Sequence, residues 1–233
     1  MRTLTKLTHV ETKLLVREPG AVFSLLIPLF ILLAFGGSIT EGDTVLLPMA
    51  ITMAIALVGV YLLPTTLATY REHGILRRLS VTPVRPGNLL VVQILLQFVL
   101  TVLAVVLLLV VGTGFLGAGV PSAAAFPVAF ALGVASTFAI GLLLAALAPN
   151  GRSANGFGVL LFFPMSYLGG LMQPPEYMPD LLAAVGRFTP LGAMRESFHS
   201  VWSGGILEPL PLITMAAYAV VLSALAARYF RWE

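Results

Sequence analysis

The chain has 233 residues, of which 58% are hydrophobic and only 10% charged, with a formal net charge of +3. A soluble globular domain carries about 25% charged residues, so this composition excludes a water-soluble enzyme domain and is typical of a membrane protein. The absence of cysteine excludes disulfides, thiolate nucleophiles and cysteine-based metal sites.

Six apolar runs are long enough to cross a bilayer, which takes about 20 residues of helix. None has Asp, Glu, Lys or Arg in its interior, as the cost of an unpaired charge in lipid requires. We therefore predict an all-α polytopic membrane protein whose residues 1–233 form a single transmembrane domain. The predicted spans lie at about 21–39, 45–67, 88–111, 123–147, 154–172 and 209–227.

The segment before the first span has apolar residues at near-helical spacing among Thr, Lys and Glu. This pattern predicts an amphipathic helix over residues 1–18 that lies in the membrane interface, and a simple charged lead-in to the first span is the alternative. The apolar positions are Leu4, Leu7, Val10, Leu14 and Leu15.

The distribution of cations predicts that both termini are cytoplasmic. With that topology eleven of the thirteen Lys and Arg residues lie on the inner side, and only Arg187 and Arg195 lie on the outer side. The opposite topology would reverse this asymmetry, against the positive-inside rule.

The loop between the second and third spans holds four of the thirteen cations, all Arg, against one acid. Apolar and cationic residues alternate in a way that predicts a short amphipathic helix over Tyr70–Leu79, which ends before Pro83 because a residue that precedes proline disfavours helical geometry. Such a helix can transmit a movement of a bound cytoplasmic protein to both spans that it connects. Attraction of the arginines to anionic lipid headgroups is the alternative explanation.

Two features of the spans predict how they pack. Pro64 is expected to bend the second span. In the fourth span a small residue recurs every fourth position, and such a stripe lets another helix approach closely, within one subunit or between subunits. The stripe is Ala129, Gly133, Thr137, Gly141 and Ala145.

The predicted outer segment between Gln173 and Glu208 is too polar to span the bilayer and too apolar to lie free in water. We predict short re-entrant helices there, broken at Pro190, before the last span. Tyr177 and Trp202 would suit the level of the headgroups.

Several chemistries are missing from the sequence. Neither Lys6 nor Lys13 follows a glycine, so the chain has no P-loop for ATP, and its three histidines are too dispersed for a zinc protease motif. We predict no catalytic residue, no metal site and no cofactor in this chain, and no nucleic-acid partner. Because no span has Asp, Glu, Lys, Arg or His in its interior, the energy for any transport is expected to come from a partner protein.

Three stretches of the chain resemble ABC-2 type transporter permeases, and most of all the daunorubicin-resistance type drug-export permeases. The stretch Arg71–Val84 is similar to the cytoplasmic segment between the second and third spans of that family. The stretch Arg17–Gly20 is similar to its entry into the first span. The third stretch comprises Met178-Pro179, Thr189-Pro190-Leu191 and Arg195-Glu196, and is similar to its outer segment.

The resemblance implies a multi-pass permease of the cell membrane that pairs with a second copy, identical or paralogous, and with two P-loop ATP-binding cassette subunits that hold ATP and Mg. The loop would then be a coupling helix that docks in a groove of the ATPase, with Glu72 as the acid, Gly74 as the close-approach position, and Ile75 and Leu76 as the apolar plug. The residues assigned to coupling are Arg71, Glu72, His73, Gly74, Ile75, Leu76, Arg77 and Arg78.

The expected function is efflux of amphiphilic or lipophilic, drug-like cargo through a cavity between two permease copies. A polysaccharide or glycolipid exporter is the alternative within transport, and a membrane scaffold that only holds lipid is the alternative outside it. The candidate cavity residues are Met53, Tyr61, Phe157, Phe162, Phe163, Met165 and Tyr167.

Overall fold

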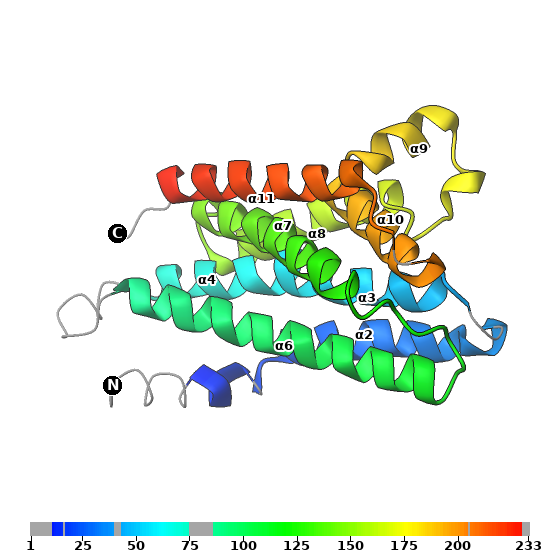
Figure 1. Cartoon of the computed structure of the whole chain (residues 1–233). Helices are drawn as coiled ribbons and strands as arrows, with labels where there is room; N and C mark the ends of the chain where they lie inside the picture. The colour runs from blue at the N-terminus through cyan, green and yellow to red at the C-terminus, as the bar shows by residue number, and fades with distance from the viewer. Residues whose placement is uncertain (1–10, 16, 40–42, 75–85, 205, 230–233) are drawn as a thin grey trace.

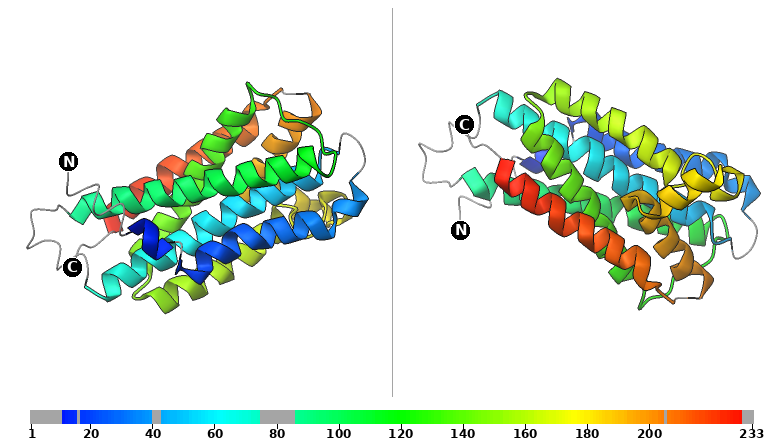
Figure 2. Two further views of the ribbon diagram at one scale, coloured as in Figure 1. Left: turned by 90° about the horizontal axis from the view of Figure 1, so that it is seen from below. Right: turned by 90° about the horizontal axis from the view of Figure 1, so that it is seen from above.

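The computed structural model describes residues 11–15, 17–39, 43–74, 86–204 and 206–229, and this part of the chain contains helices and irregular segments but no strand. The long helices lie side by side as an elongated bundle, as Figures 1 and 2 show. One end of the bundle carries the end of α4 (Leu63–Glu72) and the start of α6 (Pro86–Gly114), and we call it the α4 end. The opposite end carries α9 (Asp180–Arg187) and α10 (Pro190–Ser203), and we call it the α10 end.

Apolar helices occupy each of the six predicted spans. They are α2 (Pro19–Ala34), the continuous helix α3 (Leu46–Ala56), η2 (Leu57–Leu62) and α4 (Leu63–Glu72), then α6 (Pro86–Gly114), α7 (Phe126–Leu147), α8 (Gly151–Leu168) and α11 (Pro209–Tyr229).

Four of these helices are long and apolar enough to cross a membrane: Leu46–Glu72, Gly87–Gly114, Phe126–Leu147 and Pro209–Tyr229. The helix α2 has only 16 residues, because Gly36 and Gly37 follow it in the short 3-10 turn η1 (Gly36–Ser38). The helix α8 has 18 residues, but its first turns are polar. Four of the six predicted spans are thus both long enough and apolar enough to cross a membrane, and the count of six stays a prediction.

The helix α3–η2–α4 forms the centre of the bundle, and nearly all its side chains from Leu47 to Ala68 are buried. At η2 it widens into a π-helical turn, directly before Pro64. Proline has no N–H to donate to the carbonyl four residues earlier and its ring crowds that carbonyl, so the wider turn accommodates it. The structure thus has a π turn beside Pro64, and the predicted bend of the span stays a prediction.

The small-residue stripe of α7 packs inside the subunit. All five stripe residues are buried. A Cβ added to Gly141 would overlap the carbonyl oxygen of Gly59 in η2, and one added to Gly133 would come within 2.5 Å of the Met194 sulfur in α10. The stripe is thus the surface on which η2 and α10 approach α7. The close approach lies within one subunit, which is one of the two arrangements that the sequence predicts.

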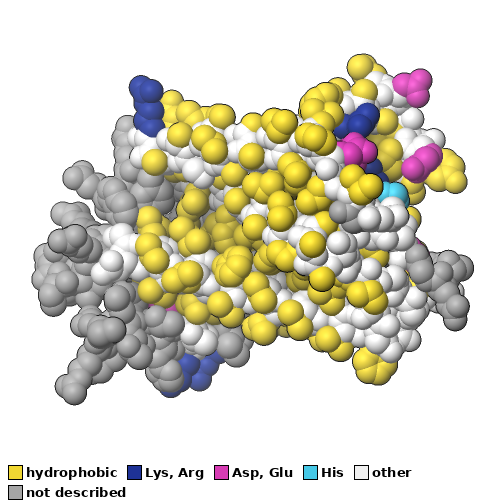
Figure 3. All heavy atoms as spheres, in the orientation of Figure 1, with side chains coloured by type: hydrophobic (Ala, Val, Ile, Leu, Met, Phe, Trp, Pro, Cys, Tyr) yellow, Lys and Arg dark blue, Asp and Glu magenta, His cyan; other side chains and the backbone are white. Residues whose placement is uncertain are grey.

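The outside of the bundle is apolar between two charged ends. On the face in Figure 3, hydrophobic side chains cover the length of the helices, and the charged side chains lie toward the two ends. Large apolar residues on three helices face outward, among them Phe30 at 71% exposure, Leu103 at 57% and Val220 at 70%. Such a surface is unfavourable in water and suits the hydrocarbon of a bilayer.

Two short helices, α9 (Asp180–Arg187) and α10 (Pro190–Ser203), precede α11 and are separated at Pro190, as expected. Thr189 caps α10 by accepting a hydrogen bond from the Gly192 N–H at 3.1 Å. Trp202 is packed inside the described bundle, and its place at the level of the headgroups stays a prediction. Its ring is buried against Phe126 and Phe198, and its indole N–H donates to the Gly119 carbonyl at 2.6 Å.

Candidate functional site: the junction at the end of α4

The helix that enters the predicted coupling segment ends earlier than expected. The helix α4 ends at Glu72, and Gly74 adopts a left-handed φ of +62° while its N–H donates to the Arg71 carbonyl at 3.0 Å. This is a helix stop that favours glycine, so one helix does not run through Tyr70–Leu79. A Cβ placed on Gly74 would meet no atom of the described residues within 4 Å, so within this part of the chain its φ is the feature that favours glycine, and the close approach to an ATPase stays a prediction.

Only half of the predicted coupling residues can be placed. Arg71, Glu72, His73 and Gly74 form the end of α4 and its cap. The remaining four, which are Ile75, Leu76, Arg77 and Arg78, lie outside the described residues. The contacts of the first four are therefore the evidence on how this segment is anchored.

Arg71 binds the carboxyl end of α7. Its guanidinium donates hydrogen bonds to the backbone carbonyl of Ala146, at 3.2 Å, and to that of Ala148. The last carbonyls of a helix have no partner within the helix and carry the negative end of its dipole. A cation at this position satisfies both the hydrogen bonds and the charge.

Glu72 binds the amino end of the next helix. One of its carboxylate oxygens, Oε2, accepts a hydrogen bond from the backbone N–H of Gly151, the first residue of α8, at 2.9 Å. The side chain of Asn150 accepts a second hydrogen bond of this helix start, from the Ser153 N–H at 2.8 Å. The acid therefore lies at the positive end of α8.

Together these contacts define a junction in which the last two residues of α4 hold the turn between α7 and α8. Each charge matches the helix end that it contacts. Gly151 makes the close approach possible, because a Cβ there would overlap the hydroxyl of Thr69 in α4. Sequence reasoning missed this junction. The cap residue Asn150, directly before a helix start, is the signal that could have indicated it.

A second set of contacts joins the N-terminal segment to the same end of the bundle. Glu11, which is 6% exposed, accepts hydrogen bonds from the Tyr70 hydroxyl and from the Gln93 amide, both at 2.6 Å. Residues 11–15 are helical, whereas the rest of the predicted interfacial helix, residues 1–10, lies outside the described residues.

Glu18 makes the next contact between the N-terminal segment and α4. The Thr66 hydroxyl donates to its carboxylate at 3.3 Å. Burial raises the pKa of the Glu18 carboxyl above its ordinary value, and the hydrogen bond from Thr66 lowers it by a smaller amount. Two acids thus tie the N-terminal segment to α4 and α6.

The seven candidate cavity residues do not surround one cavity within the described part of the chain. Met53, Phe162 and Met165 are buried in the core, whereas Phe157 and Phe163 are about half exposed on α8. The other two are partly buried: Tyr167, and Tyr61, whose hydroxyl accepts a hydrogen bond from Asn155 at 3.0 Å. Of the seven, only Phe157 lines a described cavity, an apolar hollow of about 450 Å³.

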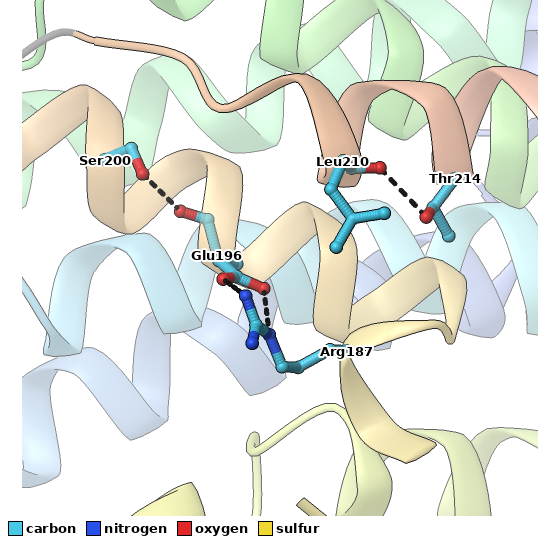
Figure 4. A network of polar contacts seen from close by, with 5 residues as sticks. All are labelled: Arg187, Glu196, Ser200, Leu210 and Thr214. Carbon is cyan, nitrogen blue, oxygen red and sulfur yellow. Dashed lines mark hydrogen bonds and ion pairs between the residues drawn. The ribbon is translucent and has the colours of Figure 1, made fainter. Parts of the chain in front are cut away.

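The larger cavity lies at the α10 end and holds about 680 Å³. The start of α3, the end of α8, α9 and α10 form its walls. At its edge Arg187 and Glu196 point toward one another and form an ion pair at 3.0 Å, as Figure 4 shows. Nowhere in the described residues do three or more His, Asp or Glu side chains form a group that could hold a metal ion.

The apolar surface, the four membrane-length helices and the charged junction define a multi-pass helical membrane protein. Residues 3–202 match the model of the ABC-2 type transporter family, and the chain belongs to this family. Members of the family are membrane transport subunits that do not hydrolyse ATP themselves.

Two curated relatives are both described as "Inner membrane transport permease YhhJ", one from Escherichia coli (strain K12) and one from Shigella flexneri. Each is 30% identical to this chain over 142 residues, which is 58% of the chain. The match spans 36% of the length of either relative.

Proposed function

We propose that this chain is the permease subunit of an ATP-binding cassette exporter in the plasma membrane. The observation that carries the proposal is the family match over residues 3–202, together with helices that can cross a membrane. In this proposal two P-loop ATPase subunits bind ATP and Mg and hydrolyse ATP, and both termini of this chain face them in the cytoplasm.

The junction supports a route by which a movement of the loop after α4, caused by the ATPase, would be transmitted to the helix bundle. A displacement of the segment after Gly74 acts on the end of α4. Because Arg71 and Glu72 hold the α7–α8 turn, the displacement also acts on α7 and α8. The proposed ATPase contact comprises the loop from Arg71 to Arg78, and the intramolecular bonds of its first two residues transmit the movement.

The proposed cargo is amphiphilic or lipophilic, as in the drug-export permeases that the sequence resembles. The pathway would lie between this chain and a second permease copy. Support comes from the exposed apolar face of α8, where Phe157 and Phe163 point away from the core and could line such a space. The daunorubicin-resistance subfamily stays part of the proposal.

Copurification and ATP hydrolysis test the proposal. The tagged chain is expressed with a P-loop ATPase encoded beside it, and the reconstituted complex is assayed with a panel of amphiphiles. We expect stable copurification and hydrolysis that rises with cargo. Glu72→Arg should leave membrane insertion intact and abolish the stimulation. A chain that binds no ATPase would instead support the scaffold alternative, and unchanged stimulation in Glu72→Arg would exclude the coupling role.

A further inference from the structure

We infer that the 680 Å³ cleft at the α10 end binds an amphiphile by its anionic group, a phosphate or a carboxylate, which Arg195 would hold. The cleft is set apart from the junction by the length of the bundle, and none of the seven candidate cavity residues lines it. The inference concerns a binding site, and it does not depend on the proposed transport function.

Arg195 is a donor without a partner in the cleft. It extends from α10 and is partly buried, and its Nε atom is buried and has no hydrogen-bond partner among the described residues. Desolvation lowers the pKa of its guanidinium, and the carboxylates of Glu196 and Glu176 raise it by smaller amounts. A ligand in the cleft cannot reach this buried nitrogen, but the rest of the guanidinium lines the cleft as a partly desolvated cation, and an anionic ligand would stabilise it there.

The charges around Arg195 leave it available. Glu196 is already engaged, because Arg187 donates to both of its carboxylate oxygens, at 3.0 and 3.5 Å (Figure 4). Glu176 is exposed on the short helix η3 (Pro175–Tyr177), and no hydrogen bond joins it to Arg195 in the described structure. His199, at the edge of the cleft, is exposed.

The shape of the wall suits a fork of guanidinium donors. Gly170 follows the end of α8 with a left-handed φ of +76°, and a Cβ there would lie 3.0 Å from the Arg195 Nε. The glycine therefore leaves room for the arginine beside the end of α8. A planar guanidinium in a fixed position recognises two oxygens of one phosphate or carboxylate.

The remaining walls predict the apolar part of the ligand. Val45, Pro48 and Met49 from the start of α3 line one side, and Ala183 and Ala184 from α9 line another. Free inorganic phosphate would leave these side chains in contact with water. An alkyl chain joined to the anionic group would cover them, and this difference is the reason that we propose an amphiphile.

Equilibrium binding of radiolabelled dodecyl phosphate to the purified chain in phosphatidylcholine nanodiscs tests the inference, with empty nanodiscs subtracted. We expect saturable binding that unlabelled dodecyl phosphate displaces, and that dodecanol and inorganic phosphate each displace at least about tenfold less well. Equal displacement by inorganic phosphate would overturn the amphiphile assignment, and equal displacement by dodecanol would overturn the anion assignment.

Three variants test whether the ligand binds in the cleft at Arg195. Arg195→Gln should weaken binding about tenfold or more, because it removes the charged donor. Arg228→Gln, which removes an exposed cation from the far end of α11, should bind as the wild type does. If Arg195→Gln does not fold, Ala184→Trp serves in its place, because it fills the cleft from an exposed position and should also abolish binding.

Glu176→Gln separates ligand binding from an internal ion pair. If Arg195 binds the anionic group of the ligand, removal of the Glu176 carboxylate should leave the binding of dodecyl phosphate unchanged or strengthen it. Loss of binding in Glu176→Gln, or wild-type binding in both Arg195→Gln and Ala184→Trp, would overturn the inference. Because this assay contains no ATPase and no transport step, such a failure would leave the proposed function as it stands.

Discussion

The Glu72 carboxylate accepts a hydrogen bond from the backbone N–H of Gly151 at 2.9 Å, across 79 residues of sequence. This bond places the last acid of α4 at the positive end of α8, where a charge contributes about 0.3–1 kcal/mol. Glu72→Gln should therefore destabilise the chain slightly, since an amide oxygen can still accept the bond. Glu72→Arg should destabilise it more, because it places a cation at the same helix end.

Thermal unfolding of the purified chain in nanodiscs compares the stability of the wild type, Glu72→Gln and Glu72→Arg. The matched control is Glu208→Gln, which alters an exposed carboxylate before α11 and should unfold as the wild type does. Equal stability of the wild type, Glu72→Gln and Glu72→Arg would show that the contact with Gly151 contributes nothing.

At Gly74 the backbone conformation and not the available space should decide which substitutions are tolerated. Its φ is +62°, and a Cβ there would meet no atom of the described residues within 4 Å. Left-handed geometry costs an L-residue about 1–2 kcal/mol, and asparagine adopts it more readily than a β-branched residue does. We therefore expect Gly74→Asn to retain most of the ATPase stimulation in the reconstituted complex and Gly74→Val to lose it.

An equal loss of stimulation in Gly74→Asn and Gly74→Val would contradict the conformational explanation. If glycine were required at position 74 for close contact with the ATPase, Asn and Val would be equally harmful because both add bulk. Surface expression and monodispersity of each variant serve as the controls for insertion.

The close approach of α7 to η2 predicts a strong effect of one methyl group. A Cβ on Gly141 would overlap the Gly59 carbonyl oxygen, which belongs to the backbone and cannot turn away. Gly141→Ala should lower the free energy of unfolding by about 1–3 kcal/mol or more, as overpacking does. Gly156→Ala is the matched control, since a Cβ there would meet no described atom within 4 Å beyond its own stretch of helix and alanine favours helix by up to about 1 kcal/mol.

Denaturant or thermal unfolding of the two alanine variants in the same nanodiscs provides the measurement. A loss of stability in both variants would indicate a general need for glycine flexibility, and a loss in neither would mean that the two helices can separate without cost.

Glu18 predicts a pH dependence of stability. Its pKa is raised from the ordinary value of 4.5, mainly by burial. As the pH falls through the folded-state pKa toward 4.5, the folded protein takes up the proton before the unfolded chain does, so the free energy of unfolding increases in that window. The contribution is lost again as the pH rises above the folded-state pKa.

Unfolding of Glu18→Gln across the same pH range should lack this component, because the neutral amide has no proton to exchange and can still accept the bond from Thr66. Its stability at neutral pH should equal or exceed that of the wild type. An identical pH profile for Glu18→Gln and the wild type would show that Glu18 is not the group responsible.

Much of the fold follows from local sequence patterns. Apolar runs of membrane length predict the helices, because each helix satisfies its own backbone hydrogen bonds and needs only an apolar surface to cross lipid. The break at Pro190 was also predictable, since proline acts on its immediate neighbours. The four-residue period of the stripe identified the packing face of α7 without reference to any partner.

Contacts between distant segments were not predictable in this way. Trp202 has the character of an interfacial residue, yet the rings of Phe126 and Phe198 bury it. The candidate cavity residues were chosen by residue type, and type alone does not distinguish a core position such as Phe162 from an exposed one such as Phe163. The left-handed φ that ends α4 at Gly74 was likewise not foreseen, because the sequence interpretation considered only its contact with a partner, which stays a prediction.

By itself the sequence determined the membrane class, the positions of the apolar helices and the concentration of arginines in the loop after α4, because these properties depend on composition and on residues that are neighbours in the chain. Only the tertiary structure decided that Arg71 and Glu72 hold the α7–α8 turn and that Arg195 lines a cleft without a hydrogen-bond partner among the described residues. The physical reason is that a charge acts on whatever helix end the packing brings within hydrogen-bond distance, and that distance depends on the whole bundle.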